Sequence, residues 1–405
     1  MNKLWVKVVI VILIIVGVGL GVYFLINRQQ KINSYQDKYQ IFVAEVYEKI
    51  QTNYWEKISD NDLSSLFLLA TNKVLSKNLV LKTPDKNGVL MLINDIENKD
   101  NLPLIVDMVL ANLKPFSRSR LYSQKEEKSL VNTVNNVNPE SDYFSKLGLG
   151  KSATTEEVVK KYEESTKTPE IEQAYKVLKN ADSRQIYAIS GVEPTIEYKL
   201  LTPSIYYVHM TKFSPTSLEE FVRVMNKVAD KADNLDTLIF DLRGNIGGAI
   251  DQLPYFLGPF IGYDNYAYQF YQQGNKDDFK TATGWLDSMV RYKKVVILID
   301  ENTQSTAEVT AAVLKKYNVG VVVGNTTKGW GTIEKVFPLD NQIKTDEKFS
   351  LFLVHHVTIA DDGQSIEGRG IVPHISIKNP NWKKELLSRF GNQEIVDEVG
   401  KILSQ

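Results

Sequence analysis

A serine stands at the predicted start of a helix in the second half of the chain. The run 300–308 (DENTQSTAE) follows an apolar strand pattern over residues 295–300 and precedes a helical pattern over residues 306–317. In that place the first-turn N–H groups and the helix dipole point toward the Ser305 hydroxyl, which suits a nucleophile whose attack creates an oxyanion. Serine is equally a favoured N-cap, and Glu308 three residues later completes a capping-box pattern. The residues alone therefore favour a helix cap at Ser305, with the nucleophile as the alternative.

Two glycine-rich turns follow other apolar strand patterns. Residues 241–248 (DLRGNIGG) form a turn whose backbone N–H groups can approach an anion, either a phosphate or a developing oxyanion. The turn is not a Walker loop, because no Gly-Lys-Ser/Thr follows it. Residues 324–334 (GNTTKGWGTIE) place Lys328 and Trp330 between glycines. A lysine there acts as a general base if burial keeps it neutral, whereas a solvated lysine in a glycine turn has no chemical role.

The composition removes several other kinds of chemistry. The 405 residues include no Cys, which excludes disulfides, thiolate metal sites and cysteine nucleophiles. The four His residues leave little for a His-rich metal centre, so we predict no metal site and no cofactor. The 48 Lys and Arg against 49 Asp and Glu give a net charge of -1, which argues against a general nucleic-acid-binding protein.

The elements that must position these residues alternate between strand and helix. Strands that are apolar on both faces and alternate with helices indicate an α/β layer with a partly parallel sheet. Short apolar runs predict strands at 204–210, 237–242, 295–300 and 319–323, and later strands at 332–339, 351–359 and 371–377. Amphipathic patterns predict helices at 218–228 and 306–317.

The N-terminal region differs in character from the rest of the chain. Residues 8–26 are 19 residues without charge, and as a helix they span about 28 Å, close to the thickness of a bilayer core. We predict an uncleaved membrane anchor, with a cleaved signal peptide as the alternative. Gly17 and Gly21 form a GxxxG pair, which is compatible with a homo-oligomer. Residues 29–141 read mostly as helices, with a polar, Asn-rich stretch at 117–141.

Residues 142–192 form a compact helical pattern that resembles a J-domain. The resemblance rests on a DYFSKLGL opening, an ATTEEVVKKY helix and an IEQAYKVLKNADSRQIY closing helix. A J-domain that stimulates Hsp70 carries His-Pro-Asp in the loop between those helices, and here the loop is Ser165-Thr166-Lys167. We therefore expect a hairpin used for packing or spacing, and we do not expect Hsp70 as a partner.

The three chemistry-bearing runs together resemble the C-terminal processing, or tail-specific, serine peptidases. Four pieces occur in the family's order: TLIFDLRGNIGG, VVILIDENTQSTAEVTAAVL, VGVVVGNTTKGWGTIE and QSIEGRGIVPHI. The earlier VAEVYEKIQTNYWEKISDNDL is similar to the family's N-terminal helical region, and NPESDYF to the motif that ends it. The resemblance covers roughly residues 42–75 and 200–377. It implies a ClpP/crotonase-like α/β core with a mixed sheet and helices, preceded by an all-α region.

The resemblance also implies roles for particular residues, because the family uses a Ser–Lys dyad that a Gln often assists. Alignment through Ala307-Glu308 places the nucleophile at Ser305, which overturns the cap-only interpretation. The implied oxyanion donors are the amide of Thr306 and that of a glycine, Gly247 or Gly248. We expect Trp330 and Arg243 to contact the substrate.

Two positions depart from the family's pattern. The family's Lys slot aligns with Trp330 and its Gln slot with Glu334, while Lys328 stands where the family usually has an aromatic residue. If the stretch is extended, residues 328 and 330 point to the same side about 6–7 Å apart, a shift that a long Lys side chain can largely cover. Glu334 is then placed to hold Lys328, although an ion pair raises a Lys pKa and works against a neutral base. The second candidate for the base is a histidine: His209, His355 or His356.

The chain is thus expected to be a membrane-anchored serine endopeptidase that cuts extracytoplasmic polypeptides, its soluble part lying outside the cytoplasm. The alternative is a non-catalytic protein that binds peptides at the same cleft, because a Trp at the Lys slot gives an apolar platform. Family members usually insert a PDZ domain where this chain has its hairpin, so selection by a PDZ groove is in doubt. The expected domains are an anchor at 1–28, a helical region at 29–141, the hairpin at 142–192, a catalytic core at 193–380 and a C-terminal helix at 381–405.

Overall fold

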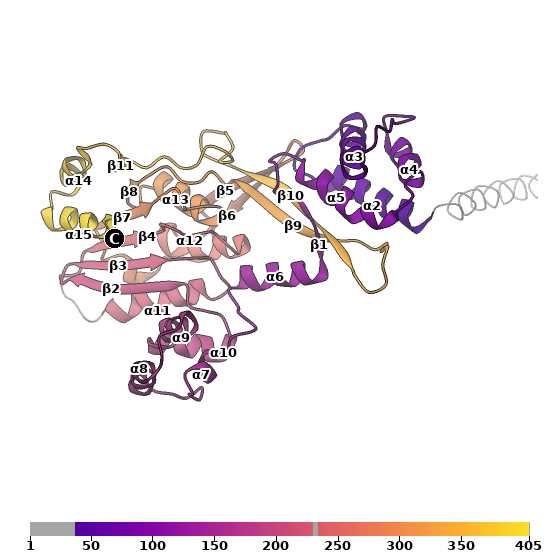
Figure 1. Cartoon of the computed structure of the whole chain (residues 1–405). Coiled ribbons are helices and arrows are strands. Elements are labelled where there is room, and N and C mark those ends of the chain that lie inside the picture. The colour runs from indigo at the N-terminus through magenta and orange to yellow at the C-terminus, as the bar shows by residue number, and fades with distance from the viewer. Residues whose placement is uncertain (1–36, 230–233, 405) are drawn as a thin grey trace, which may run out of the picture. The chain divides into compact units, whose positions relative to one another are not determined.

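The computed structural model describes residues 37–229 and 234–404 (Figure 1). The predicted anchor at residues 8–26 lies outside these residues, so it stays a prediction. Within the described part, no helix combines the length and the apolar character that crossing a membrane requires. The chain divides into two compact units, each with its own contacts.

The first unit combines residues up to Asn53 with Lys57–Gln124 and Val336–Leu353. Its predicted helical character is present: the stripe Phe42, Val43, Val46 and Ile50 is fully buried along one helix. One strand was missed by sequence reasoning, because the polar stretch at 117–141 begins with a short strand that pairs antiparallel with residues 349–352. The elements of this unit are α2 (Lys38–Asn53), α3 (Asp60–Leu75), α4 (Lys86–Asn94), the short 3-10 helix η1 (Lys99–Asn101), α5 (Leu102–Ala111) and β1 (Arg120–Ser123).

The second unit holds a six-stranded sheet in the order β11-β8-β7-β4-β3-β2. The four neighbours from β8 to β3 run parallel, β11 joins β8 in parallel, and β2 is antiparallel at the edge. The mixed α/β fold is therefore confirmed. The strands are β2 (Ile196–Thr202), β3 (Ile205–Met210), β4 (Thr237–Asp241), β7 (Lys294–Ile299), β8 (Val321–Gly324) and β11 (Ile375–Ser376).

Both faces of this sheet are covered, which explains why its strands are apolar throughout. Alternate residues of one strand enter different cores: Phe240 packs among the helices α11, α12 and α13, whereas Ile239 packs against the two C-terminal helices. The helices are α11 (Ser217–Ala229), α12 (Leu253–Ile261), α13 (Thr306–Lys316), α14 (Trp382–Phe390) and α15 (Gln393–Leu403), with 3-10 turns η2 (Ile250–Gln252) and η3 (Asp287–Met289).

Further strands form a separate antiparallel sheet, of which β5, β6, residues 332–335 and residues 354–359 belong to the second unit. The end of β10, from Val357 to Ile359, pairs with β5, and β5 pairs with β6. Sequence reasoning missed β5 and β6, whose tyrosines and charged residues lack an apolar run. The strands are β5 (Tyr266–Gln272), β6 (Asn275–Lys280), β9 (Thr332–Pro338) and β10 (Phe349–Ile359).

A small helical module follows α6 (Gln124–Asn135) and has its own apolar core, in which Phe144, Val158 and Leu178 are buried. The expected closing helix is in fact two helices, because the Asn180 side chain accepts from the amides of Asp182 and Ser183 and starts a new one. The module consists of α7 (Tyr143–Lys146), α8 (Thr155–Glu164), α9 (Pro169–Leu178) and α10 (Ala181–Ser190).

Two expectations about the C-terminal part differ from the structure. The predicted strand at 371–377 contains only Ile375–Ser376 as strand, because the residues before it serve as a loop against another turn. The predicted helix at 381–405 is divided into α14 and α15 at Gly391, which adopts a left-handed φ of 62°.

Candidate active site

Three loops leave the same edge of the parallel sheet. They follow β4, β7 and β8, which are neighbours in the sheet and end at matched register positions, such as Asp241 beside Leu298. The carboxyl ends of parallel strands form the usual site of ligands in open α/β sheets. The three sequence runs that carry candidate chemistry, 241–248, 300–308 and 324–334, therefore meet at one edge.

Hydrogen bonds fix the first loop against the second. The Asp300 carboxylate accepts from the backbone amides of Gly244 (2.9 Å) and Thr303 (2.8 Å). The Gln304 amide donates to the Asn245 carbonyl oxygen at 2.9 Å, and the buried Asn245 side chain donates to a carbonyl at the end of β3. The residue before Ser305 is thus tied directly to the glycine-rich turn.

Ser305 precedes α13 with an unusual backbone conformation. Its φ of 57° and ψ of −126° lie in a region that L residues rarely adopt, whereas ordinary N-caps are extended. The Glu308 amide, which lies near the hydroxyl, donates to the Ser305 carbonyl oxygen at 2.8 Å, and no side-chain hydrogen bond of Ser305 caps the helix. Ser305 is half-buried. Ser305 and Glu308 thus keep the arrangement of a capping box, but the Glu308 amide gives its hydrogen bond to the Ser305 carbonyl oxygen and not to the hydroxyl.

The two glycines of the turn lie against Ser305 and its surroundings. A Cβ at Gly247 would come within 2.7 Å of the Ser305 Cβ, and one at Gly248 within 1.9 Å of the Phe213 carbonyl oxygen. Such distances are far below ordinary contact, so both positions require glycine. The Thr306 hydroxyl donates to the Gly248 carbonyl oxygen at 3.0 Å, which joins the turn to the first residue of α13.

The predicted oxyanion donors differ in whether their backbone amides already have an acceptor. The Gly247 amide donates to the Asn245 side-chain oxygen at 2.9 Å and is already satisfied. In contrast, the amides of Gly248 and Thr306 donate to no acceptor among the described residues. Two N–H groups beside Ser305 are thus available for an external acceptor, which is the arrangement that an oxyanion hole needs.

Glu308 is a fully buried carboxylate that joins the second loop to the third. It accepts from the Ser305 amide (2.9 Å), the Thr327 hydroxyl (2.5 Å), and the amides of Gly329 and Trp330 (both 2.7 Å). Sequence reasoning gave Glu308 only a capping role. The Ser-x-x-Glu spacing predicts a helix cap and does not predict contacts with the loop after β8. A buried charge is tolerable when several donors surround it, as here.

Lys328 lies on the loop that Glu308 holds. Its amide donates to the Thr303 carbonyl oxygen at 3.0 Å, and its side chain is exposed and forms no ion pair with any described carboxylate. The stretch is not extended as assumed, because residues 326–331 form no strand and Gly329 has a left-handed φ of 78°. The argument that residues 328 and 330 point to the same side therefore does not apply.

Glu334 contacts Trp330 instead of the expected Lys328. Its Oε1 accepts from the Trp330 indole N–H at 3.2 Å and from the Thr332 hydroxyl at 2.6 Å. The expected contact between Glu334 and Lys328 is absent, since Lys328 forms no ion pair with a described carboxylate and the Trp330 indole is a donor to Glu334. Trp330 and Glu334 thus form a pair at the two positions where the family has Lys and Gln.

The Arg243 guanidinium is held by Asp241 and by the end of α15. It donates to both carboxylate oxygens of Asp241, at 2.8 Å from Nη2 to Oδ2, and to the Ile402 carbonyl oxygen at the end of α15. The predicted substrate contact at Ser305 is therefore not supported by the geometry, because the buried Asp241 carboxylate fixes the guanidinium.

The three candidate histidines hydrogen-bond other groups, and none of them hydrogen-bonds Ser305. His209 Nε2 lies 3.1 Å from the Arg243 carbonyl oxygen, and His355 Nδ1 lies 2.7 Å from the Gln272 amide nitrogen. His356 is buried 3.5 Å from Asp277. Burial, together with the neighbouring His355, lowers the pKa of His356 to about 4, so it is neutral at pH 7.

The fourth motif of the sequence closes the third loop. The Ile371 amide donates to the Thr327 hydroxyl at 2.7 Å, and the Gly331 amide donates to the Glu367 carboxylate at 2.8 Å. The motif QSIEGRGIVPHI therefore supports the turn that carries Lys328 and Trp330. Among residues 37–229 and 234–404, no group of three or more His, Asp or Glu side chains is arranged to hold a metal ion.

Comparison with known proteins agrees with this geometry. Residues 204–377 match the family described as peptidase family S41. The chain is 27% identical over 191 residues to the carboxy-terminal processing protease CtpB of Bacillus subtilis, covering 46% of this chain and 36% of that one. It is 31% identical over 149 residues to a probable CtpA-like serine protease of Staphylococcus epidermidis, covering 36% and 28%.

The fold is also similar to that of a solved peptidase. The photosystem II D1 C-terminal processing protease superposes with a TM-score of 0.52 at 13% identity, over 84% of this chain and 93% of that one. At this identity the likeness concerns the fold alone. The chain matches about a third of the length of its curated relatives. The predicted resemblance is confirmed over the region that carries all three loops, because residues 204–377 match peptidase family S41.

Proposed function

We propose that the protein is a serine endopeptidase with Ser305 as its nucleophile. The observation that carries the proposal is the geometry at the start of α13: a serine with a φ of 57° stands beside two amides that have no acceptor among the described residues. Strained backbone conformations persist where the surrounding structure enforces them and are frequent at active sites. The match to peptidase family S41 supports the same chemistry.

In the proposed reaction the Ser305 Oγ attacks the carbonyl carbon of the scissile peptide bond. The negative charge that develops on the carbonyl oxygen is held by the amides of Gly248 and Thr306. The N-terminal end of α13 adds a favourable dipole at the same place. The Gly247 amide does not take part, because it is committed to Asn245.

Lys328 is the proposed base that takes the Ser305 proton and returns it to the leaving amine. Its loop is held beside the nucleophile by the bond to the Thr303 carbonyl and by Glu308, which contacts both loops. A lysine acts as a base only in its neutral form, which closure over a substrate favours by desolvation. Trp330, half-buried and bonded to Glu334, is the proposed apolar wall for the substrate.

The proposal includes the membrane anchor. The uncharged run 8–26 supports attachment to a bilayer, which would place polypeptides at the membrane surface within reach of Ser305. The substrates proposed on this basis are extracytoplasmic polypeptides. This part rests on the sequence alone.

The test uses the full chain purified in detergent. A serine-directed fluorophosphonate probe should label the wild-type protein and the Ser59→Ala variant, whose serine is an ordinary helix cap, but not Ser305→Ala. Casein cleavage should follow the same order. Equal labelling of Ser305→Ala and wild type would contradict the assignment of the nucleophile.

The base is tested separately. Lys328→Ala should lose casein cleavage, whereas Lys335→Ala, at an exposed strand position a few residues away, should retain it. Full activity of Lys328→Ala would show that another group accepts the proton. Peptide binding without turnover in the wild type would support the non-catalytic alternative.

A further inference from the structure

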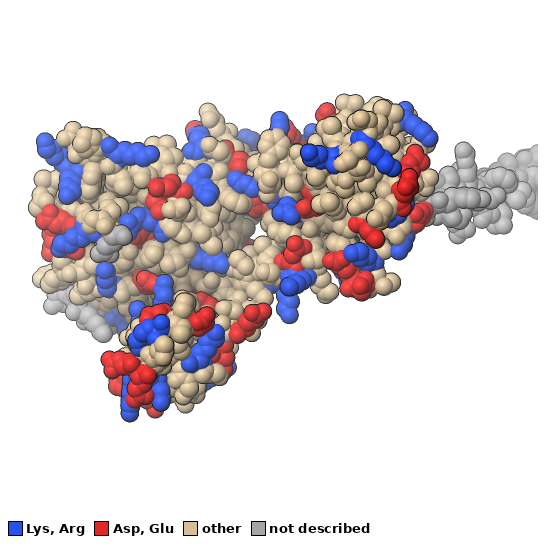
Figure 2. All heavy atoms as spheres, in the orientation of Figure 1, with Lys and Arg blue, Asp and Glu red and all other residues tan. Residues whose placement is uncertain are grey.

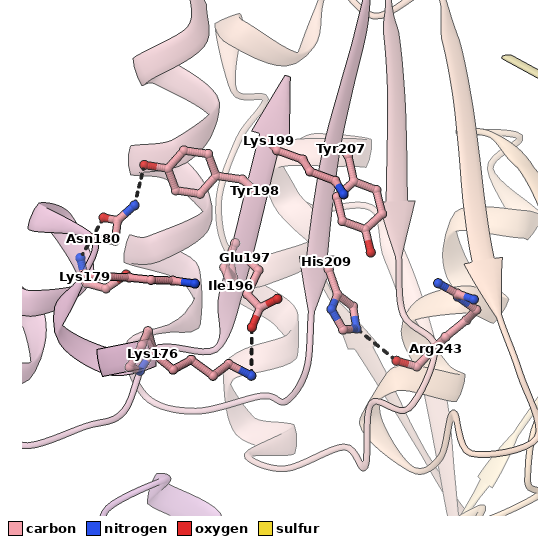
Figure 3. Close-up of a pocket in the computed structure, with 12 residues that line it drawn as sticks. Lys176, Lys179, Asn180, Ile196, Glu197, Tyr198, Lys199, Tyr207, His209 and Arg243 are labelled. Carbon is pink, nitrogen blue, oxygen red and sulfur yellow. Dashed lines mark hydrogen bonds and ion pairs between the residues drawn. The ribbon is translucent and has the colours of Figure 1, made fainter. Parts of the chain in front are cut away.

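A polar pocket of about 480 Å³ lies where the helical module meets the sheet of the second unit (Figure 3). It is lined from α9 and its C-terminal residue by Lys176 and Lys179, from β2 by Glu197 and Lys199, and from the loop after β4 by Arg243. In Figure 3 the two lysines of the module extend toward β2. Apart from Arg243 in the glycine-rich loop, the lining residues named here belong neither to the family motifs nor to the proposed catalytic residues.

The charges that line the pocket are unbalanced. Four of the lining side chains are cationic and one is a carboxylate, although the whole chain has a net charge of -1. On the face shown in Figure 2, the two signs of charge are interspersed over the surface. The local excess of positive charge is therefore a property of this pocket and not of the composition.

Two of the four cations form no ion pair among the described residues, although Lys179 lies near enough to Glu197 for its charge to act on that carboxylate. Lys176 pairs with Glu197 at 2.8 Å, and Arg243 with Asp241 at 2.8 Å. Lys179 and Lys199 are exposed and approach aromatic rings, the latter at 5.3 Å from the centre of Tyr207. Such ammonium groups retain most of their attraction for an external anion.

The form of the pocket favours a polypeptide over a small molecule. Pockets for small molecules are mostly apolar with a few polar groups, whereas this pocket is lined by long charged side chains on an open surface. Charged surfaces of that kind steer and orient charged macromolecules. β2 is also the last strand of its sheet, so an extended chain can lie along it.

The pocket is connected to the proposed catalytic centre. Arg243 lines the pocket, and Gly248, the proposed oxyanion donor, follows five residues later. Five residues of backbone span at most about 18 Å. The Cα atoms of Arg243 and Gly248 are therefore at most about 18 Å apart, a separation that an extended polypeptide of about five to seven residues covers.

We propose that this pocket is an exosite for acidic polypeptide segments, in which Lys179 and Lys199 bind side-chain carboxylates of the substrate. The inference rests on the proposed function in so far as the bound segment belongs to a peptidase substrate. Binding of an acidic segment does not itself require catalysis. It predicts that the preferred substrates carry Asp or Glu about five to seven residues from the bond that is cut. The helical module thus contributes to selection at the position where the family usually has a PDZ domain.

The experiment measures binding with the Ser305→Ala full chain in detergent. The probe is a fluorescent twelve-residue peptide with four Glu near one end and an amidated C-terminus, so that no terminal carboxylate contributes. Its match is the same peptide with four Gln. We expect the Glu peptide to bind at least fivefold more tightly than the Gln peptide, and this difference to shrink as salt is raised from 50 to 300 mM.

Charge variants locate the binding. The pair Lys179→Gln/Lys199→Gln should weaken binding of the Glu peptide about fivefold and leave the Gln peptide unchanged. The control pair, Lys160→Gln/Lys276→Gln, removes two exposed lysines that do not line the pocket and should have no effect. Equal binding of the two peptides, or equal loss in the two variant pairs, overturns the exosite.

Cleavage then separates the two proposals. Wild-type protein with a quenched fluorescent version of the Glu peptide should show a lower KM than with the Gln version, and the lysine pair should raise that KM with kcat unchanged. If the Ser305→Ala protein binds the Glu peptide through the two lysines but the wild type cleaves neither peptide, the binding site stands and the peptidase proposal fails. If the wild type cleaves both peptides equally, the peptidase stands and the exosite fails.

Discussion

Two helices of this protein begin with the same sequence pattern and differ in structure. α8 starts with Thr154 and Glu157, and α13 with Ser305 and Glu308, each a hydroxyl residue followed three positions later by Glu. At α8 the Thr154 hydroxyl accepts from the Glu157 amide at 3.2 Å, and the Thr154 amide donates to the Glu157 carboxylate at 2.7 Å. This is a complete capping box with a φ of −78° at Thr154.

At α13 only one half of that box caps the helix with a hydrogen bond. The Ser305 amide donates to the Glu308 carboxylate at 2.9 Å, which corresponds to the bond in α8. In the other half the Ser305 hydroxyl lies near the Glu308 amide, but that amide donates to the Ser305 carbonyl oxygen at 2.8 Å. Glu157 is exposed, whereas Glu308 is buried and accepts from three further donors on the loop of Lys328. The same pattern thus stabilises a helix in one place and, in the other, joins the proposed nucleophile to the loop of Lys328.

The largest expected effect is the difference in peptide cleavage between removing the Ser305 hydroxyl and removing the Thr154 hydroxyl. Ser305→Ala should reduce kcat/KM for peptide cleavage at least about 10³-fold, because it removes the nucleophile. Thr154→Ala should leave cleavage unchanged and reduce the free energy of unfolding by about 1 kcal/mol, the usual cost of a lost cap. Cleavage of a quenched peptide and urea denaturation measure the two effects. A similar loss of activity in both variants would show that Ser305 matters only for stability.

The next largest expected effect is the difference in stability between changing the Glu308 carboxylate and changing the Glu157 carboxylate. Glu308→Gln replaces one acceptor oxygen by an amide NH₂ in a buried site where four groups donate to the carboxylate, so at least one donor loses its partner. We expect a loss of about 3 kcal/mol in the free energy of unfolding, together with lower activity. Glu157→Gln, at an exposed position, should cost less than about 0.5 kcal/mol. Thermal denaturation of both variants tests this difference, and equal melting temperatures would contradict the role given to Glu308.

This comparison also shows how far the sequence leads. Apolar runs predicted the parallel strands and the helices between them, because burial on both faces leaves a clear pattern. Ser305 and the turn at Gly247 and Gly248 were found from motifs whose order matched a family. The functions of Glu308 and Gly329 were not visible, because the first depends on donors about twenty residues away and the second on a backbone angle.

Other misses have similar causes. β5 mixes aromatic residues with glutamines and β6 is mostly charged, so neither has a plain apolar run and sequence reasoning missed their pairing. Arg243 follows directly after a strand, where a substrate contact is plausible, but its partner is the carboxylate of Asp241 two residues earlier. The approach of Lys176 and Lys179 to β2 depends on how the module packs against the sheet, which no local pattern contains.

A smaller effect tests the space beside Ser305, the proposed nucleophile. Gly247→Ala adds a methyl group that would lie 2.7 Å from the Ser305 Cβ, so the serine or the turn must move. Gly244→Ala in the same turn is the matched control, because Gly244 has a similar φ of 66° but no atom within 4 Å of the added methyl group. We expect Gly247→Ala to lower kcat about 10²-fold and Gly244→Ala to lower stability with little change in kcat. Equal kcat values for the two variants would exclude a close fit at Ser305.

The smallest expected effect is a pH-dependent loss of stability at His356 on β10, which the module of α8 should not show. The pKa of His356 is lowered to about 4 by burial, with His355 adding repulsion and Asp277 opposing the shift, whereas an unfolded His has a pKa near 6.5. Between these values the unfolded chain binds more protons than the folded chain, so this contribution to stability is complete above about pH 6.5 and decreases toward pH 4. We expect the wild type to lose about 1 kcal/mol more of its free energy of unfolding than His356→Gln between pH 7.5 and 5.5, measured by urea denaturation.

Hydrogen exchange compares the two regions. The module of α8 contains no histidine, so exchange on α8 should reveal none of this His-dependent change. Exchange on β10, which carries His356, should accelerate in the wild type only. A His-dependent acceleration on both elements would mean that the module and the sheet unfold as one cooperative unit, and its absence on β10 would contradict the shifted pKa.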